Sequence, residues 1–220
     1  EQNFVPAMLS LARCYEKGIG VWRSISKAFG MFKKAAELGD GQGQYELAKC
    51  SETSRGTRRN MKQAAKYYLK AADTGEHNGD LFRHAKFLLP IQATGCFGIL
   101  TRRCYWDGSQ AWHSLGLCYW GGEGVPRDTK IAVKWFMKAA DSGNSVAQNF
   151  LGDCYYEGKN VEQDKAKATL WYRKAASQGM INSIHSLGLC YENGEGVERD
   201  LEKARHWFRC GAATGHQKSR

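Results

Sequence analysis

The sequence predicts an all-α protein built from repeated two-helix units. Three observations support this fold class: a period of 36 residues, apolar side chains at helical spacing, and glycine-rich turns between paired helices. The period links three sets of residues, which are Cys118, Cys154 and Cys190; Trp135, Trp171 and Trp207; and Asp128, Asp164 and Asp200. Because a unit of this length holds one helical hairpin, the repetition predicts a stack of hairpins along a single domain, residues 1–220.

The boundaries of the units follow from the cysteines. Cys14 and Cys50 are again 36 residues apart, but Cys50 lies 68 residues before Cys118, four short of two periods. One unit has therefore lost residues and most of its pattern. The expected units are residues 6–41, 42–77, 78–108, 109–144, 145–180 and 181–216, with the third degenerate.

The first helix of each unit, helix A, is clearest in residues 109–144. Ala111, Leu115 and Cys118 recur at helical spacing and, with Tyr119, give this helix one apolar stripe. Gly122 and Gly124 are expected to end the helix, because a left-handed turn costs glycine little.

The second helix, helix B, is predicted to begin after an N-capping residue. Asp128 suits that position, because a carboxylate accepts a backbone N–H and favours the positive end of a helix dipole. Ser24 and Asn60 hold the same place in the first two units, and both are good caps. Gly143 is expected to end the helix. The predicted buried face of helix B consists of Ala132, Trp135, Phe136, Ala139 and Ala140.

Long stretches of the chain match one another in register. They are LGLCYWGGEGVPRDTKIAVKWFMKAADSG (115–143), LGDCYYEGKNVEQDKAKATLWYRKAASQG (151–179) and LGLCYENGEGVERDLEKARHWF (187–208). This pattern resembles the Sel1-like repeat family, relatives of the tetratricopeptide repeats. The resemblance implies a right-handed α/α superhelix, a solenoid, that acts as a scaffold or adaptor for protein or peptide partners. Residues 51–60, SETSRGTRRN, depart from the glycine-rich turn, and the third unit departs almost completely.

Residues 78–108 allow two interpretations. In the first, they are a decayed repeat that bends the superhelix, with Pro90 ending its first helix. In the second, they are a partner-specific insertion. Deleting residues 90–105 and measuring thermal stability and partner recovery separates the two interpretations.

The composition is that of a folded protein with a basic surface. Hydrophobic residues make up 42% and charged residues 25% of the chain, and the formal net charge is +10. No apolar stretch reaches the roughly 18 residues that span a bilayer. The charge favours anionic partners, and a denser basic patch provides the alternative function, anion or nucleic-acid binding. That patch consists of Arg55, Arg58, Arg59 and Lys62.

The residues that could carry chemistry are assigned to the scaffold. Equivalent cysteines in stacked repeats lie roughly 8–10 Å apart, beyond the reach of a disulfide, so five of the eight are predicted to be buried packing residues. A Cys96–Cys104 bridge remains open, as does the state of Cys210. The tryptophans of the 36-residue period are expected in the core. We expect no catalytic residues, metal or cofactor, and the cysteine pattern favours a reducing compartment such as the cytoplasm. A targeting peptide outside this sequence is compatible with that expectation.

The candidate binding residues lie on the A helices, where side chains vary while the repeat pattern stays constant. Three columns of equivalent positions vary in this way: Leu9, Tyr45, His113, Asn149 and His185; Met8, Gln44, Trp112, Gln148 and Ile184; and Arg13, Lys49, Leu117, Asp153 and Leu189. From them we select an outward-facing partner-binding set on the concave side. It consists of Trp112, His113, Gln148, Asn149, Asp153 and His185, with Trp120 and Tyr156 at the rim. Because the ends of the expected array lack polar caps, they allow either further repeats in a longer protein or self-association.

Overall fold

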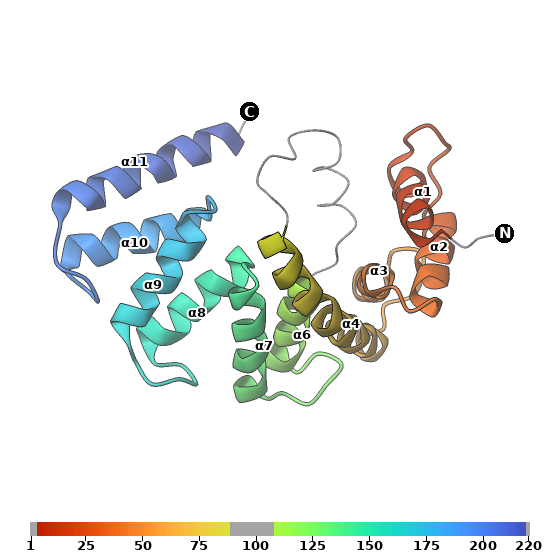
Figure 1. Ribbon diagram of the computed structural model, residues 1–220, viewed down its shortest axis with the longest axis horizontal. Coiled ribbons are helices and arrows are strands. Elements are labelled where there is room, and N and C mark those ends of the chain that lie inside the picture. The colour runs from red at the N-terminus through yellow and green to blue at the C-terminus, as the bar shows by residue number, and fades with distance from the viewer. Residues whose placement is uncertain (1–3, 89–107, 219–220) are drawn as a thin grey trace. The chain divides into compact units, whose positions relative to one another are not determined.

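Every element in the described residues is a helix. The computed structural model describes residues 4–88 and 108–218, and the side chains of residues 4–74 and 108–214 (Figure 1). The chain forms two compact units, residues 1–128 and 129–220. The helices of the first unit are α1 (Val5–Lys17), α2 (Ile25–Glu37), α3 (Gly41–Thr53), α4 (Met61–Leu88) and α6 (Ser109–Gly121). Those of the second are α7 (Thr129–Asp141), α8 (Ser145–Glu157), α9 (Lys165–Ala176), α10 (Ile181–Asn193) and α11 (Leu201–Lys218).

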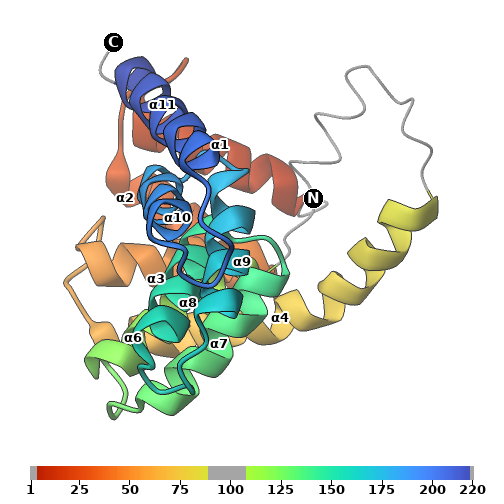
Figure 2. The ribbon, with the colours of Figure 1, turned by 90° about the vertical axis from the view of Figure 1, so that its left-hand side faces the viewer.

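The helices pack as consecutive antiparallel pairs, as the repeat predicts. In the first unit α1 packs on α2, α2 on α3, α3 on α4, and α4 on α6. In the second unit α7 packs on α8, α8 on α9, α9 on α10, and α10 on α11, which lies across α10 in Figure 2. The fold is therefore an α/α solenoid, and within each compact unit every helix contacts its neighbours in the chain.

The turns between helices A and B form as the glycines predict. Gly122 has a φ of +74° and its N–H donates to the Cys118 carbonyl at 2.8 Å, which ends α6. The next glycine of the turn, Gly124, has a φ of +78° and lies against the backbone of α4. A Cβ at Gly124 would stand 2.2 Å from the Met61 carbonyl oxygen, so this position needs both a left-handed backbone and the absence of a side chain.

The predicted N-caps are confirmed where the hydrogen bond is present. Ser24 accepts from the Lys27 N–H at 3.4 Å, Asn60 from the Gln63 N–H at 3.0 Å, and Asp164 from the Lys167 N–H at 2.9 Å. Asp128 directly precedes α7, and its own N–H donates to the Tyr119 carbonyl at 2.9 Å. That backbone bond recurs at Ser24 and Asp164, which donate to Tyr15 and Tyr155.

The core is formed by alanines, leucines, cysteines and one aromatic per hairpin. In the repeat of residues 109–144, four of the residues predicted to be buried are at most 1% exposed: Ala132, Phe136, Ala139 and Ala140. The prediction for Trp135 is wrong, because this side chain is only half-buried, as are Trp171 and Trp207. The neighbouring aromatic position points inward instead. It holds Phe32, Tyr68, Phe136 and Tyr172, none more than 3% exposed.

Two B helices run past the glycine that was expected to end them. Gly39, Gly143 and Gly179 follow α2, α7 and α9 with positive φ. The helices α4 and α11 instead continue through Gly75 and Gly215, to Leu88 and Lys218. Glycine permits a helix to end but does not require it. After α2 and α7 the chain turns at once into a capped helix A, with Asp40 and Asn144 as the caps.

Part of the degenerate unit lies outside the described residues. The predictions on Pro90, Cys96 and Cys104 fall there, as does the choice between a bend and an insertion.

Candidate functional site

In the column of Met8, Trp112 and Gln148, the last two lie in interfaces between repeats and not on an open surface. Trp112 is 6% exposed, and its Nε1 donates to the Ala72 carbonyl of the preceding helix B at 3.2 Å. Gln148 is 4% exposed, and its Nε2 donates to the Ala140 carbonyl at 2.9 Å. The expectation that Trp112 and Gln148 face outward is therefore wrong. Gln148 thus satisfies a carbonyl in the last turn of α7, whereas Trp112 bonds a carbonyl in the interior of α4.

Asn149 and Asp153 of the predicted set lie together in the second compact unit, residues 129–220. The Asn149 Nδ2 donates to the Asp153 Oδ2 at 3.2 Å. The Ser183 Oγ of α10 donates to the Asn149 Oδ1 at 2.6 Å, and the Tyr172 hydroxyl of α9 donates to the Asp153 Oδ1 at 2.8 Å. Three helices thus hold one polar cluster, which we define as Asn149, Asp153, Tyr172 and Ser183.

The electrostatics of this polar cluster reflect partial burial. Burial raises the pKa of the Asp153 carboxyl, although the hydrogen bond from Tyr172 partly offsets this effect. Burial and the hydrogen bond to Asp153 raise the pKa of the Tyr172 hydroxyl. At neutral pH the cluster is therefore a fixed set of hydrogen bonds around a half-buried carboxylate.

A more exposed stripe of side chains runs along α10 beside this cluster. His185 is exposed, and its ring centroid lies 5.7 Å from that of Phe208. Leu189 is 38% exposed, one helical turn after His185. On α8 the matching stripe begins with Val146, which is 47% exposed. The sequence interpretation placed Leu189 in a variable column but did not select it, and Val146 was missed because its column was not considered.

The remaining predicted residues are not members of the polar cluster. Tyr156 is at the end of α8, where its hydroxyl donates to Glu195 in the turn after α10. That hydrogen bond raises the pKa of Tyr156 to about 12, and Lys165 also donates to Glu195, at 2.7 Å. Trp120 and His113 belong to α6 of the first unit, both half-buried, and burial lowers the pKa of His113.

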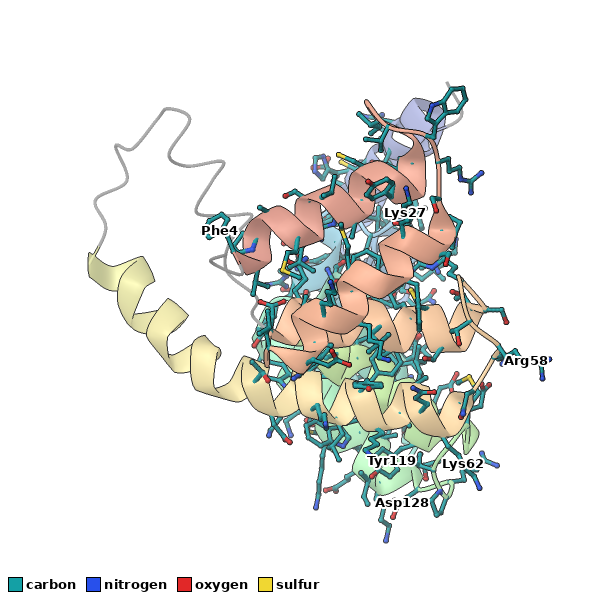
Figure 3. The ribbon with its side chains drawn as sticks, turned by 90° about the vertical axis from the view of Figure 1, so that its right-hand side faces the viewer. Phe4, Lys27, Arg58, Lys62, Tyr119 and Asp128 are labelled. Carbon is teal, nitrogen blue, oxygen red and sulfur yellow. The ribbon has the colours of Figure 1, made fainter. Side chains whose placement is uncertain are left out.

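Two arginines of the basic patch, Arg55 and Arg59, are paired with acidic side chains of the first compact unit. The Arg55 guanidinium pairs with Glu16 and lies 3.7 Å from a carboxylate oxygen of Glu46. The Arg59 guanidinium lies 3.4 Å from Glu123. Arg58 and Lys62 are exposed, and Figure 3 shows both at the edge of this unit. Lys62 also begins a stripe of exposed lysines on α4, followed by Lys66 and Lys70.

Four of the five cysteines in the repeat are buried as predicted, and Cys14 is half-buried. All five are free thiols, and so is Cys210. Burial raises the pKa of Cys50, Cys118 and Cys154 to about 11 each. A thiol with such a pKa is almost entirely protonated at neutral pH, so these side chains behave as small apolar residues.

The half-buried tryptophans carry a feature that the sequence interpretation missed. The ammonium of Lys138 lies 4.9 Å from the ring centroid of Trp135, and that of Lys174 lies 3.9 Å from Trp171. Lys70 and Tyr67 form the same pair three residues apart, at 5.7 Å. Each cation–π pair is worth about 0.5–1 kcal/mol at an exposed site. The signal was present in the sequence as an aromatic residue three positions before the lysine in three of the four K-A-A motifs, those of Lys70, Lys138 and Lys174.

Within residues 4–74 and 108–214 no group of three or more histidine, cysteine or acidic side chains is placed to hold a metal ion. Among the helices that the structure describes, none has the length and hydropathy needed to cross a membrane.

The fold and the geometry of its interfaces define the class of protein, a solenoid of short two-helix repeats. A family model described as Sel1 repeat matches residues 5–40, 41–75, 109–144, 145–180 and 181–216. The chain belongs to the Sel1 repeat family. Three of the matched segments have the bounds expected from the 36-residue period, and the first two differ from them by one or two residues. The predicted fold class is confirmed.

Solved structures support the same conclusion. The chain is similar to c5321, described as a protective antigen present in uropathogenic Escherichia coli strains and displaying an SLR fold. The TM-score is 0.78 and the identity 28%, over 97% of this chain and 39% of c5321. It is also similar to a Sel1 repeat protein from Oxalobacter formigenes, with a TM-score of 0.74 and 26% identity, over 97% of this chain and 74% of that one. A Klebsiella pneumoniae structure described as a putative Sel1 repeat protein shares the fold at 19% identity, with a TM-score of 0.52. This chain thus spans less than half the length of c5321. A comparison with curated protein sequences finds no match.

Proposed function

We propose that this protein is a non-catalytic scaffold that binds a protein or peptide partner on the exposed face of its A helices. The observation that carries the proposal is the surface of the second unit formed by Val146 on α8 and by His185 and Leu189 on α10. These exposed side chains stand beside a rigid hydrogen-bonded pair, Asn149 and Asp153. Exposed apolar anchors next to fixed polar groups are what a peptide-binding surface needs, because the polar groups set the orientation of the ligand.

The fold favours this interpretation over an enzyme. The side chains that could carry chemistry in the described residues serve other roles: the cysteines of the repeat pack, and the capping aspartates satisfy helix ends. Sel1 repeats commonly mediate protein interactions and their proteins are typically non-catalytic, which fits that distribution.

The test is a binding measurement with two matched leucine variants. Peptides are first selected against the 220-residue chain by display, and their affinities are then measured by fluorescence anisotropy. Leu189→Asp is expected to weaken binding at least about tenfold, which corresponds to about 1.4 kcal/mol. Leu170→Asp is the control, because Leu170 is 48% exposed on α9, a helix B. Equal loss in both variants, or no loss in Leu189→Asp, would contradict the proposal.

The choice of variants follows from the structure. Asn149 is hydrogen-bonded to Ser183 and Asp153. Replacing it by alanine therefore disturbs the packing of α8 with α10 as well as any ligand contact. Trp112 and Gln148 are buried between repeats, so a bound partner would not reach their side chains. His185→Ala removes an exposed side chain and is the cleaner second variant.

A second candidate function rests on the lysine stripe of α4. Lys62, Lys66 and Lys70 are exposed at steps of four residues, on one side of the helix. Such a stripe suits an anionic partner such as nucleic acid. Phosphate contacts make affinity fall steeply with salt, so single-stranded and duplex oligonucleotides are titrated at low and high salt. Replacing the three lysines by glutamine should then abolish the binding. A lack of binding at low salt would remove this candidate.

A further inference from the structure

The turn between α1 and α2 exposes two large apolar side chains. Trp22 is 95% exposed, and Ile19 in the same turn is 61% exposed. Tryptophan is on average one of the more buried residues of folded proteins, because its large ring gains much from leaving water. The turn of residues 18–23, which we call the apolar tip, is therefore a candidate for contact with an apolar phase or partner.

The exposure of Trp22 follows from its register in the repeat. Its equivalents in the other turns are exposed although each of those turns follows an earlier repeat, and they are Arg58, Pro126, Glu162 and Glu198. Ile19 also has two exposed equivalents, Glu123 and Lys159. The register of Trp22 thus faces solvent whether or not another repeat precedes it. None of these equivalents is a large apolar residue, so the tip departs from the repeat pattern.

The turn between α3 and α4 lies beside the apolar tip in the first compact unit. The Arg55 guanidinium pairs with Glu16, near the end of α1. An added Cβ at Gly56 would stand 3.0 Å from the carbonyl oxygen of Ile25, the first residue of α2. Residues 54–60 therefore contact the chain both before and after the tip.

These two neighbouring turns form a basic surface. Residues 17–27 and 53–63 contain no aspartate or glutamate, and their basic residues are Lys17, Arg23, Lys27, Arg55, Arg58, Arg59 and Lys62. All of these except Arg55 are exposed. The equivalent stretches of the later repeats are 121–131, 157–167 and 193–203, and each contains at least as many acidic as basic residues. The positive charge is thus concentrated around the tip, and Figure 3 shows Arg58 and Lys62 at this edge of the unit.

An apolar tip among exposed basic side chains is complementary to the surface of an anionic bilayer. Tryptophan is enriched at the interface between lipid and water, where its ring lies at the level of the headgroups. Lysine and arginine are attracted by the negative surface potential of anionic lipids. Single-stranded nucleic acid would account for the basic residues and for stacking on Trp22, but not for Ile19, which has no aromatic ring. The pair of apolar side chains therefore favours a lipid surface.

We propose that the apolar tip inserts into the interface of a bilayer that contains anionic lipids, while Arg58 and Lys62 of the neighbouring turn contact the headgroups. Such binding combines buried apolar area with attraction to anionic lipids. The residues involved differ from those of the partner surface on α8 and α10, so this proposal does not depend on the proposed function.

Cosedimentation of the 220-residue chain with vesicles tests the proposal. We expect binding to vesicles of phosphatidylcholine with phosphatidylserine, and much weaker binding to phosphatidylcholine alone. Trp22→Ala is expected to weaken binding to the anionic vesicles at least about tenfold, because the tryptophan supplies most of the apolar area of the tip. The tryptophan emission of the wild-type protein should also shift to shorter wavelength on binding, and this shift should be smaller in Trp22→Ala. No binding to anionic vesicles, or equal binding by Trp22→Ala, would overturn the proposal.

A matched pair of double variants separates a local contact from the effect of net charge. Arg58→Gln with Lys62→Gln is expected to weaken binding about fivefold for each charge removed. Lys130→Gln with Lys134→Gln removes the same charge from exposed positions of α7 and should bind nearly as the wild type does. Equal loss in both double variants would overturn the assignment to the turns.

Two further measurements distinguish the other outcomes. Circular dichroism verifies that each variant is folded, as expected for changes at exposed positions. Binding of single-stranded oligonucleotides that is lost in Trp22→Ala, without binding to vesicles, would identify nucleic acid as the occupant and overturn the lipid proposal. Leu189→Asp should bind anionic vesicles as the wild type does, and Trp22→Ala should retain peptide binding, so failure here is distinguishable from failure of the proposed function.

Discussion

The aspartates before the B helices show how one side chain joins local structure to stability. The Asp164 carboxylate accepts the Lys167 N–H at 2.9 Å and lies 3.0 Å from the Lys167 ammonium. These hydrogen bonds, that of the backbone first, lower the pKa of Asp164 from 3.8. Because the folded state favours the ionised carboxyl, the cap adds stability above the unfolded pKa and loses it as pH falls through the folded pKa.

Asp164→Ala is therefore expected to lower the melting temperature at pH 7. The difference from the wild-type protein should shrink as the pH falls below the unfolded value of 3.8, where the wild-type carboxyl becomes protonated. Asp164→Asn is the control, since asparagine caps a helix without a charge and should retain most of the stability at pH 7. Thermal unfolding followed by circular dichroism between pH 2.5 and 7 gives the measurement. A difference between the alanine variant and the wild type that stays constant over this range would contradict the role of the ionised cap.

At the scale of the helices, the spacing between helices A and B depends on small residues in helix A. A Cβ at Gly152 would stand 2.4 Å from the ring of Tyr172, and one at Gly188 would stand 2.4 Å from the ring of Phe208. Tyr172 is held in place by its hydrogen bond to Asp153 at 2.8 Å, so its ring has little freedom to move away. Ala12 holds the same register in the first repeat, which shows that a hairpin accommodates a methyl there when its other residues are chosen to suit.

The two kinds of helical glycine should respond to alanine in opposite directions. Gly152→Ala is expected to lower the free energy of unfolding by about 1–3 kcal/mol, because overpacking exceeds the gain in helix propensity. Gly30→Ala in α2 is the matched control. An added Cβ there meets nothing within 4 Å, so the substitution should raise the free energy by about 0.5–1 kcal/mol. Urea unfolding of both variants measures these changes, and a stabilising Gly152→Ala would show that the hairpin relaxes easily.

The helices and turns were predictable because the period repeats the same local signals several times. Glycine turns, N-caps and alanine pairs act within a few residues of their own position, so the sequence determines them locally. The inward aromatic was harder to predict. Trp135 and Phe136 are adjacent, and only packing decides that Phe136 is buried and Trp135 lies beside Lys138.

The candidate site was only partly predictable for a related reason. Helical spacing identifies the stripe of helix A that faces its own helix B, but it does not identify the stripe that faces the preceding repeat. Met8, Trp112 and Gln148 vary as a binding surface would, yet the last two are buried between repeats. His185 and Leu189 lie on a third side of the helix, which only the structure separates from the other two.

For the whole molecule, each repeat presents one face to its predecessor and another to its successor. Within each compact unit, the contacts of every helix with its chain neighbours make stability a sum of local hairpins and their interfaces. The side chains that take part in neither face are the ones available to a partner, which is why the proposed surface lies around His185 and Leu189.

Removing the last repeat tests how much the interfaces between repeats add to stability. A chain of residues 1–180 lacks α10 and α11 and exposes Tyr172, Ala175 and Ala176 of α9, which the full chain buries. We expect it to remain helical with a lower melting temperature, because it loses the hydrogen bonds of Ser183 and Glu195. Circular dichroism measures the helix content and the thermal unfolding of the shortened and the full chain. An unchanged melting temperature would mean that the interface of α9 with α10 contributes little to stability.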